Sequence, residues 1–82
     1  MNSMKITIIG AGYVGYSLGL ALSENHNIKI LDIDKKKVQL INKSIPIFEE
    51  ELVKKYLTKN LKLSATDSEN GLFENEDFVI IS

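Results

Sequence analysis

The 82-residue sequence contains no cysteine and no tryptophan, one proline and one histidine, and its formal net charge is only −1. Without cysteine the chain has no disulfide, no thiolate nucleophile and no cysteine ligand for a metal ion. Ten basic and eleven acidic residues nearly cancel, which gives no electrostatic reason to expect nucleic acid or an anionic membrane as a partner. At 82 residues, the chain is expected to form one small domain at most.

The chain also lacks a long uninterrupted apolar run. Glycines and polar residues break up the most apolar stretch, residues 6–22, so we expect neither a membrane span nor a cleavable signal segment, and a cytoplasmic location. The single histidine, His26, lies in a polar turn and is interpreted as solvated rather than catalytic. Three glutamates at 49–51 suit the start of a helix better than a metal site. No catalytic residue and no metal ligand is predicted.

One stretch, from Lys5 to Asp32, carries the strongest functional signal. The apolar run 6–9 predicts a strand buried on both faces, and it leads directly into a turn with the spacing G-x-G-x-x-G. The residues of that turn are Gly10, Ala11, Gly12, Tyr13, Val14 and Gly15. A helix over 13–23 and a second strand over 28–31 are expected next, and the acid follows that strand directly.

This order of strand, glycine turn, helix, strand and acid is the pattern of a dinucleotide-binding unit. Gly10 would allow the tight turn, Gly12 would let a pyrophosphate approach the backbone, and Gly15 would let the helix pack closely on the strand. The helix start offers free N–H groups and a positive dipole end to phosphates. Asp32, about 20 residues further on, would accept hydrogen bonds from the adenosine ribose and repel the 2′-phosphate of NADP. We therefore expect NAD as the cofactor.

Apolar spacing predicts which side chains of each helix face the sheet. In the first helix these are Val14, Leu18, Ala21 and Leu22. Asp34 is a suitable N-cap for a second helix, which would turn Val38 and Ile41 inward. A third helix is expected after Pro46, and its apolar stripe consists of Leu52, Val53, Tyr56 and Leu57.

Two further strands complete the pattern. Alternation over 61–65 predicts a strand with one solvated face, and the apolar run 78–81 predicts one that needs cover on both faces. Between them, Thr66 and Glu69 resemble a capping box that opens a helical turn through Phe73.

The predicted fold is α/β, a Rossmann-like parallel sheet with helices on both faces and about four strands in the order 3-2-1-4. That order leaves the apolar fourth strand at an edge with no fifth strand beside it. We expect the chain to be the front half of a longer domain. Self-association through the exposed fourth strand is the less favoured alternative.

The chain resembles the N-terminal part of the UDP-glucose 6-dehydrogenase family in four segments, MKITIIGAGYVG, LDIDKKKVQLIN, SIPIFEEELVKKYL and DFVIIS. The wider group includes GDP-mannose and UDP-N-acetylmannosamine dehydrogenases. The most specific part of the match is the combination of GAGYVG with the D-x-D-x-x-K-V stretch and the Pro-Ile-x-Glu loop, because many Rossmann proteins have only the first.

The resemblance implies an NAD-dependent enzyme that oxidises the C6 alcohol of a nucleotide sugar, such as UDP-glucose, to a carboxylate in two hydride transfers. It also implies that the backbone at Tyr13 and Val14 lies on the pyrophosphate, and that Asp32 and Lys37 bind the adenosine ribose. The family's catalytic cysteine, its lysine and asparagine helpers and its sugar-nucleotide domain have no counterpart here. Residues 1–82 are thus expected to form a partial NAD-binding domain, inactive in isolation, which would meet a nucleotide sugar only through missing downstream domains.

Other interpretations stay open from the sequence. Potassium-transport regulators contain a non-catalytic nucleotide-sensing module with the same strand, GxGxxG and D-x-D, although residues 42–60 add a proline loop and a helix that such modules usually lack. A truncated gene product without activity is a third interpretation. Lys37 stays open between a ribose contact and an ordinary solvated helix face.

Overall fold

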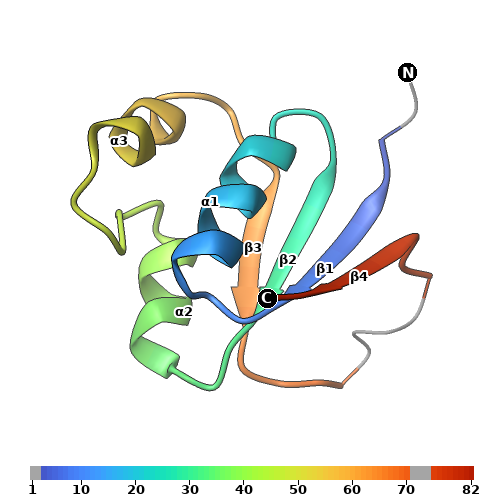
Figure 1. Ribbon diagram of the computed structural model, residues 1–82. Helices are drawn as coiled ribbons and strands as arrows, with labels where there is room; N and C mark the ends of the chain where they lie inside the picture. Colours follow the sequence, from blue (N-terminus) through green and yellow to red (C-terminus); the bar gives the residue numbers. More distant parts are fainter. Residues whose placement is uncertain (1–2, 71–74) are drawn as a thin grey trace.

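The centre of the computed structural model, which describes residues 3–70 and 75–82, is a parallel sheet of four strands (Figure 1). The strands are β1 (Lys5–Ile9), β2 (Asn27–Leu31), β3 (Leu63–Thr66) and β4 (Phe78–Ile81). Isoleucine-rich β1 and β2 pair in the middle, β3 lies outside β2, and β4 lies outside β1. The predicted α/β fold with strand order 3-2-1-4 is confirmed.

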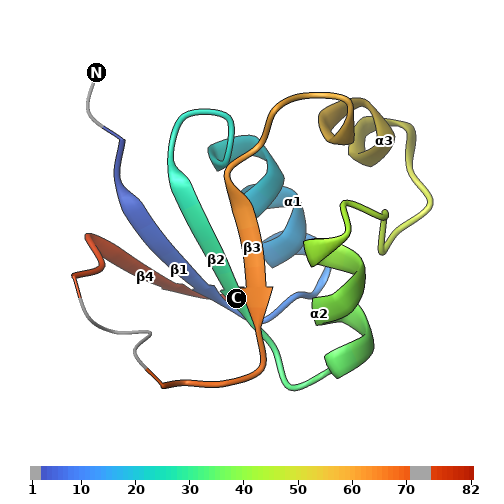
Figure 2. The same cartoon turned by 180° about the vertical axis from the view of Figure 1, so that it is seen from behind.

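Three helices cover one face of this sheet, as the two opposite views show (Figures 1 and 2). They are α1 (Tyr13–Leu22), α2 (Lys35–Asn42) and α3 (Glu51–Leu57). The expectation of helices on both faces is wrong for the described residues, because none of their helices lies on the second face. Residues 71–74, in the β3–β4 connection, lie outside the described residues. In the described part of the chain, no helix is long and apolar enough to cross a membrane.

Local capping was predicted correctly in one place and wrongly in another. The Asp34 carboxylate accepts the backbone N–H groups of Lys36 and Lys37 at 3.0 and 3.3 Å, so it caps α2 as expected. The helical turn expected from Thr66 is wrong for residues 66–70, where the Thr66 hydroxyl accepts the N–H of Ser68 in a non-helical turn. Its predicted continuation to Phe73 lies outside the described residues.

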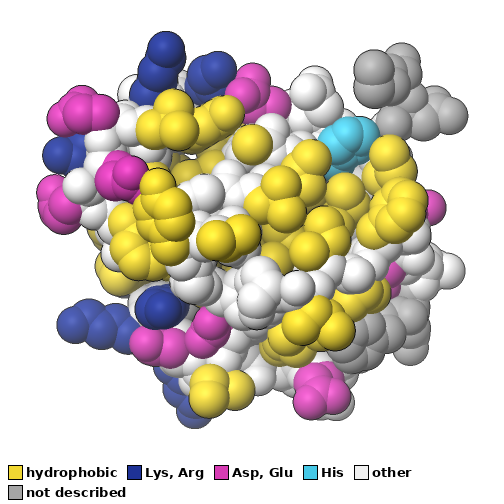
Figure 3. Space-filling view, in the orientation of Figure 1, with side chains coloured by type: hydrophobic (Ala, Val, Ile, Leu, Met, Phe, Trp, Pro, Cys, Tyr) yellow, Lys and Arg dark blue, Asp and Glu magenta, His cyan; other side chains and the backbone are white. Residues whose placement is uncertain are grey.

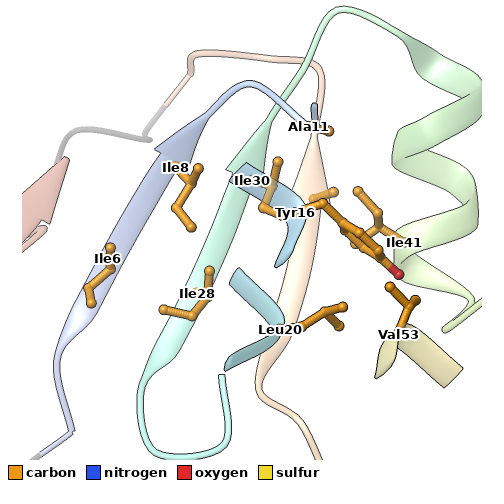
Figure 4. Close-up of a cluster of buried hydrophobic side chains, with 10 residues drawn as sticks. Ile6, Ile8, Ala11, Tyr16, Leu20, Ile28, Ile30, Ile41 and Val53 are labelled. Atoms are coloured by element: carbon orange, nitrogen blue, oxygen red, sulfur yellow. The ribbon is translucent and has the colours of Figure 1, made fainter. Parts of the chain in front are cut away.

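Strand isoleucines form the floor of the hydrophobic core, and one or two side chains from each helix close it (Figure 4). The buried apolar residues labelled there are Ile6, Ile8, Ala11, Tyr16, Leu20, Ile28, Ile30, Ile41 and Val53. The inward position of Ile41 and the partial burial of Val38 confirm the prediction for α2.

The face of α1 that packs on the sheet matches the predicted one only in part: Leu18 and Leu22 are half-buried against the core, as expected. Val14 is 70% exposed and Ala21 is exposed, whereas Gly15, Tyr16, Gly19 and Leu20 are buried. The reason is close approach: a methyl group added at Gly19 would lie only 3.2 Å from the Ile30 side chain. A glycine gives no hydrophobic signal, so apolar spacing missed the two glycines of the buried face and wrongly included Val14 and Ala21. In α3, Leu52 is likewise exposed although Val53 is buried.

Strand β4 leaves apolar side chains at the surface, as its edge position predicts. It pairs with β1 on one side, and among the described residues no strand pairs with its other side. Phe78 and Val79 are exposed and Ile81 is 79% exposed. Hydrophobic side chains reach the surface over much of the face seen in Figure 3.

The hydroxyl of Tyr16 provides a test of this core. Tyr16 is fully buried, and its hydroxyl has no hydrogen-bond partner among residues 3–70 and 75–82. Burial raises the pKa of this hydroxyl, and the backbone of Ile47, which approaches it outside hydrogen-bonding geometry, opposes the shift in part. Because an unsatisfied buried hydroxyl is unfavourable, Tyr16→Phe should raise the free energy of unfolding by about 1 kcal/mol in denaturant titrations.

The matched variant Tyr16→Ala removes the ring itself and should lower the free energy of unfolding by about 4 kcal/mol. A Tyr16→Phe protein less stable than the original would contradict this description of the hydroxyl.

Candidate functional site

The glycine turn lies at the carboxyl ends of β1 and β2, beside the end of β4 (Figure 1). Chain order along the sheet reverses between β1 and β4, and ligands of open α/β sheets bind at such a reversal. The Gly10 N–H donates to the Leu31 carbonyl at 2.8 Å, and the Ser82 N–H donates to the Ile9 carbonyl at 3.1 Å. Both neighbouring strands thus hold the turn in place.

The three motif glycines meet different constraints. Gly10 has φ +106°, a conformation that strongly favours glycine, as predicted for the tight turn. A methyl group at Gly15 would overlap the Gly10 carbonyl oxygen and the Ser82 hydroxyl. Gly15 therefore allows α1 to approach the turn and the end of β4. The close packing expected at Gly15 is thus against the turn and Ser82, and a second close approach, to the strand side chains, is at Gly19.

Gly12 is the exception, because no contact with the described residues requires it to be glycine. Its φ of −70° suits any residue, and a methyl group added there would meet nothing within 4 Å. Gly12 is the N-cap of α1, and its carbonyl accepts the first helical hydrogen bond, from the Tyr16 N–H at 2.9 Å. The N–H groups before Tyr16 have no partner within the helix. Open space therefore lies beside free donors at a helix N-terminus.

Asp32 follows β2 and reaches back to the turn. One carboxylate oxygen accepts the Ala11 N–H at 2.6 Å, and the other accepts the Asp34 N–H at 2.8 Å. The Lys37 ammonium lies 3.5 Å from the Ala11 carbonyl oxygen. Burial by itself would raise the pKa of Asp32, but the two backbone hydrogen bonds and the charge of Lys37 outweigh it and lower the pKa below its ordinary value. The carboxylate is therefore ionised at neutral pH.

Sequence reasoning missed the side-chain contact between Tyr13 and the segment before α3. The Tyr13 hydroxyl donates to Glu50 at 2.9 Å, and the Tyr13 and Phe48 rings meet edge to face at 5.5 Å. The hydrogen bond to Glu50, with the negative charge of that carboxylate, raises the pKa of Tyr13. The glutamate run had been assigned to the helix dipole alone, and no local pattern could have revealed a partner 37 positions away.

Two more residues beside the turn went unnoticed. Ile33, next to Asp32, is 93% exposed, which is unusual for a large aliphatic side chain. The Ser82 hydroxyl lies 3.2 Å from the Gly10 carbonyl oxygen. An apolar residue directly after Asp32 was a signal available in the sequence, whereas the position of Ser82 depends on strand pairing.

The remaining candidates lie elsewhere. His26 accepts the Met4 N–H at 3.0 Å near the start of β1, at the end of the sheet opposite the turn. It is partly buried and structural, so the expectation of a simply solvated residue was only partly right. Lys35 pairs with Asp67 at 4.0 Å. In the described ranges, no group of three or more His, Cys, Asp or Glu side chains is arranged so that it could hold a metal ion.

Strand order, reversal point and glycine turn together define a Rossmann-type domain of the dinucleotide-binding class. The family model for the NAD-binding domain of the UDP-glucose/GDP-mannose dehydrogenase family matches residues 4–82. The chain belongs to this family, whose domain binds NAD.

Curated relatives carry the name UDP-glucose 6-dehydrogenase. Those from Streptococcus pneumoniae and Bacillus subtilis are 38% and 40% identical over 96% of this chain, but the chain spans only 20% and 19% of their length. Among solved structures, a ternary complex of GDP-mannose dehydrogenase from Pseudomonas aeruginosa superimposes with a TM-score of 0.86 and 28% identity, over 96% of this chain and 19% of that one. A UDP-glucose dehydrogenase from Pyrobaculum islandicum, at 23% identity and a TM-score of 0.78, shares the fold over 99% of this chain and 20% of its own.

The lowered pKa of Asp32 predicts how stability depends on pH. Because the pKa is lower in the folded than in the unfolded chain, the ionised carboxylate stabilises the fold above its ordinary pKa of 3.8, and this contribution is lost as pH falls through the lowered value. In denaturant titrations at a series of pH values, Asp32→Asn should be destabilising near neutrality, and the difference should shrink in acid.

The control for this titration is Asp67→Asn, which alters an exposed ion pair and should have little effect at any pH. An Asp32→Asn effect that stays constant into acid would show that the charge of Asp32 does not stabilise the fold.

Proposed function

We propose that this chain binds NAD, with the pyrophosphate at the start of α1 and the adenosine ribose at Asp32. The observation that carries the proposal is the open space at Gly12, since nothing in the fold itself demands a glycine there. The backbone N–H groups at Tyr13 and Val14 begin α1 beside that space, where the helix dipole favours phosphate. The family assignment supports the same ligand.

The donor and acceptor chemistry of the site fits the cofactor. The ionised Asp32 carboxylate can accept hydrogen bonds from ribose hydroxyls, and Lys37 adds a donor on the same side of the turn. The exposed Ile33 side chain offers an apolar surface to the adenine base. When bound, NAD accepts a hydride. The residues described here hold and orient it.

Asp32 also favours NAD over NADP, because its charge would repel a 2′-phosphate. Two of the three nearby lysines have other contacts, Lys35 with Asp67 and Lys37 with the Ala11 carbonyl. Lys36 is exposed and would offset the repulsion only weakly in water.

We further propose that the chain is the cofactor-binding part of a UDP-glucose 6-dehydrogenase, which oxidises UDP-glucose to UDP-glucuronate with NAD. Identities of 38% to 40% with the relatives of that name support this substrate. The 82 residues contain no cysteine, so a thiol nucleophile would have to come from outside them. Sugar recognition and catalysis would likewise depend on residues outside this chain, and the free edge of β4 could pair with a strand of the same polypeptide or of a second copy.

A substitution at Gly12 tests the pyrophosphate assignment. Gly12→Val should leave the fold intact, because a Cβ atom at this position would meet nothing within 4 Å among the described residues, but its side chain should block the phosphates. NAD affinity in calorimetry should fall about a hundredfold or more, equivalent to the loss of two charge-assisted hydrogen bonds of ~1.5 kcal/mol each.

The matched control is Gly15→Ala, in which the smaller side chain would overlap the Gly10 carbonyl and destabilise the fold itself. A folded Gly12→Val protein that binds NAD as tightly as the original would show that the pyrophosphate lies elsewhere.

A further inference from the structure

Two side chains hold both polar backbone groups of Ala11. The Asp32 carboxylate accepts its N–H at 2.6 Å, and the Lys37 ammonium lies 3.5 Å from its carbonyl oxygen. These charged groups come from the end of β2 and the first turn of α2. We call this pair of contacts the Ala11 clamp.

The clamp completes the fixation of the turn. Gly10 is already tied by its N–H to the Leu31 carbonyl at 2.8 Å, and its carbonyl oxygen lies 3.2 Å from the Ser82 hydroxyl. Gly12 is tied through its carbonyl to the Tyr16 N–H. Among the described residues, charged side chains contact the backbone of Ala11 but not that of Gly10 or Gly12.

The Asp32 carboxylate is itself fixed in this position. Its second oxygen accepts the Asp34 N–H at 2.8 Å, so each oxygen already has one backbone donor. A carboxylate has about four acceptor positions, which leaves room for ribose hydroxyls as well. The same side chain can therefore serve the turn and the ribose together.

Building on the proposed NAD site, we propose that Asp32 and Lys37 are positioning residues for the pyrophosphate as well as ligands of the ribose. They hold Ala11, and Ala11 fixes Gly12 at the point where the backbone meets the phosphates. Two of the three turn residues are glycines, which lose the most conformational freedom on ordering. A turn ordered in advance avoids that loss when the ligand binds.

An NAD analogue without adenosine ribose hydroxyls distinguishes the positioning of the turn by Asp32 from direct binding of the ribose by Asp32. The probe is an NAD analogue whose adenosine ribose lacks both hydroxyls, and its affinity is measured by calorimetry for the original protein and for Asp32→Ala. If the clamp positions the phosphates, Asp32→Ala should bind the analogue about tenfold more weakly, the usual effect of one lost charge-assisted hydrogen bond. Equal affinities would overturn the proposal, because Asp32 would then act on the hydroxyls alone.

Lys37 has a matched control one position away. Lys37→Ala and Lys36→Ala remove the same charge from the same turn of α2, but only Lys37 is in contact with Ala11 among the described residues. Lys37→Ala should weaken binding of the analogue about threefold more than Lys36→Ala does. This effect is smaller than that of a full charge-assisted hydrogen bond, because the contact between Lys37 and Ala11 is long. Equal effects would overturn the part of the proposal that concerns Lys37.

Amide hydrogen exchange tests the clamp without any ligand. The Ala11 N–H should exchange about tenfold faster in Asp32→Ala than in the original protein, in line with the same lost hydrogen bond. If Asp32→Ala does not fold, Asp32→Leu has a side chain of similar size without any acceptor oxygen and serves for both measurements. An original protein that binds neither NAD nor the analogue would refute the proposed function, whereas an unchanged Ala11 exchange rate would refute the clamp.

Discussion

Only three residues, Gly10 to Gly12, carry the chain from the end of β1 to the first turn of α1, and the rest of the structure depends on this short connection. It sets φ at Gly10 to +106° and brings α1 so close that Gly15 has no room for a methyl group. The same geometry directs the N-terminus of α1 to the carboxyl edge of the sheet, beside the ends of β2 and β4. The site is thus a direct consequence of how the helix is joined to the strand.

The glycines of the turn are needed for different reasons. Gly10 and Gly15 are explained by backbone conformation and close approach inside the protein. Gly12 is not, since its conformation suits any residue and the space beside it is open. A glycine that the fold does not need, next to free helix donors and an ionised aspartate, is best explained by a ligand that approaches the backbone.

Much of this could be predicted from the sequence because strong local signals agreed with one another. Isoleucine-rich runs, the glycine spacing and the acid after β2 fixed the strand order, and Asp34 identified the start of α2. The buried face of α1 was predicted only in part, with Leu18 and Leu22 correct, because Gly19 allows close contact with the sheet but carries no hydrophobic signal. The helical turn expected after Thr66 was wrong because its hydroxyl closes a different local turn. The contacts of Asp32 with Ala11 and of Tyr13 with Glu50 join distant parts of the chain, which only the fold brings together.

The most direct test of the account is an amide NMR titration of the 82-residue chain with NAD. The account predicts a dispersed spectrum in which the resonances of residues 10–15 and of Asp32 shift on addition of the cofactor, with those on β3 little changed. A dispersed spectrum in which these resonances stay still at millimolar NAD, or in which the shifts fall on another part of the chain, would contradict the assignment of the glycine turn as the cofactor site.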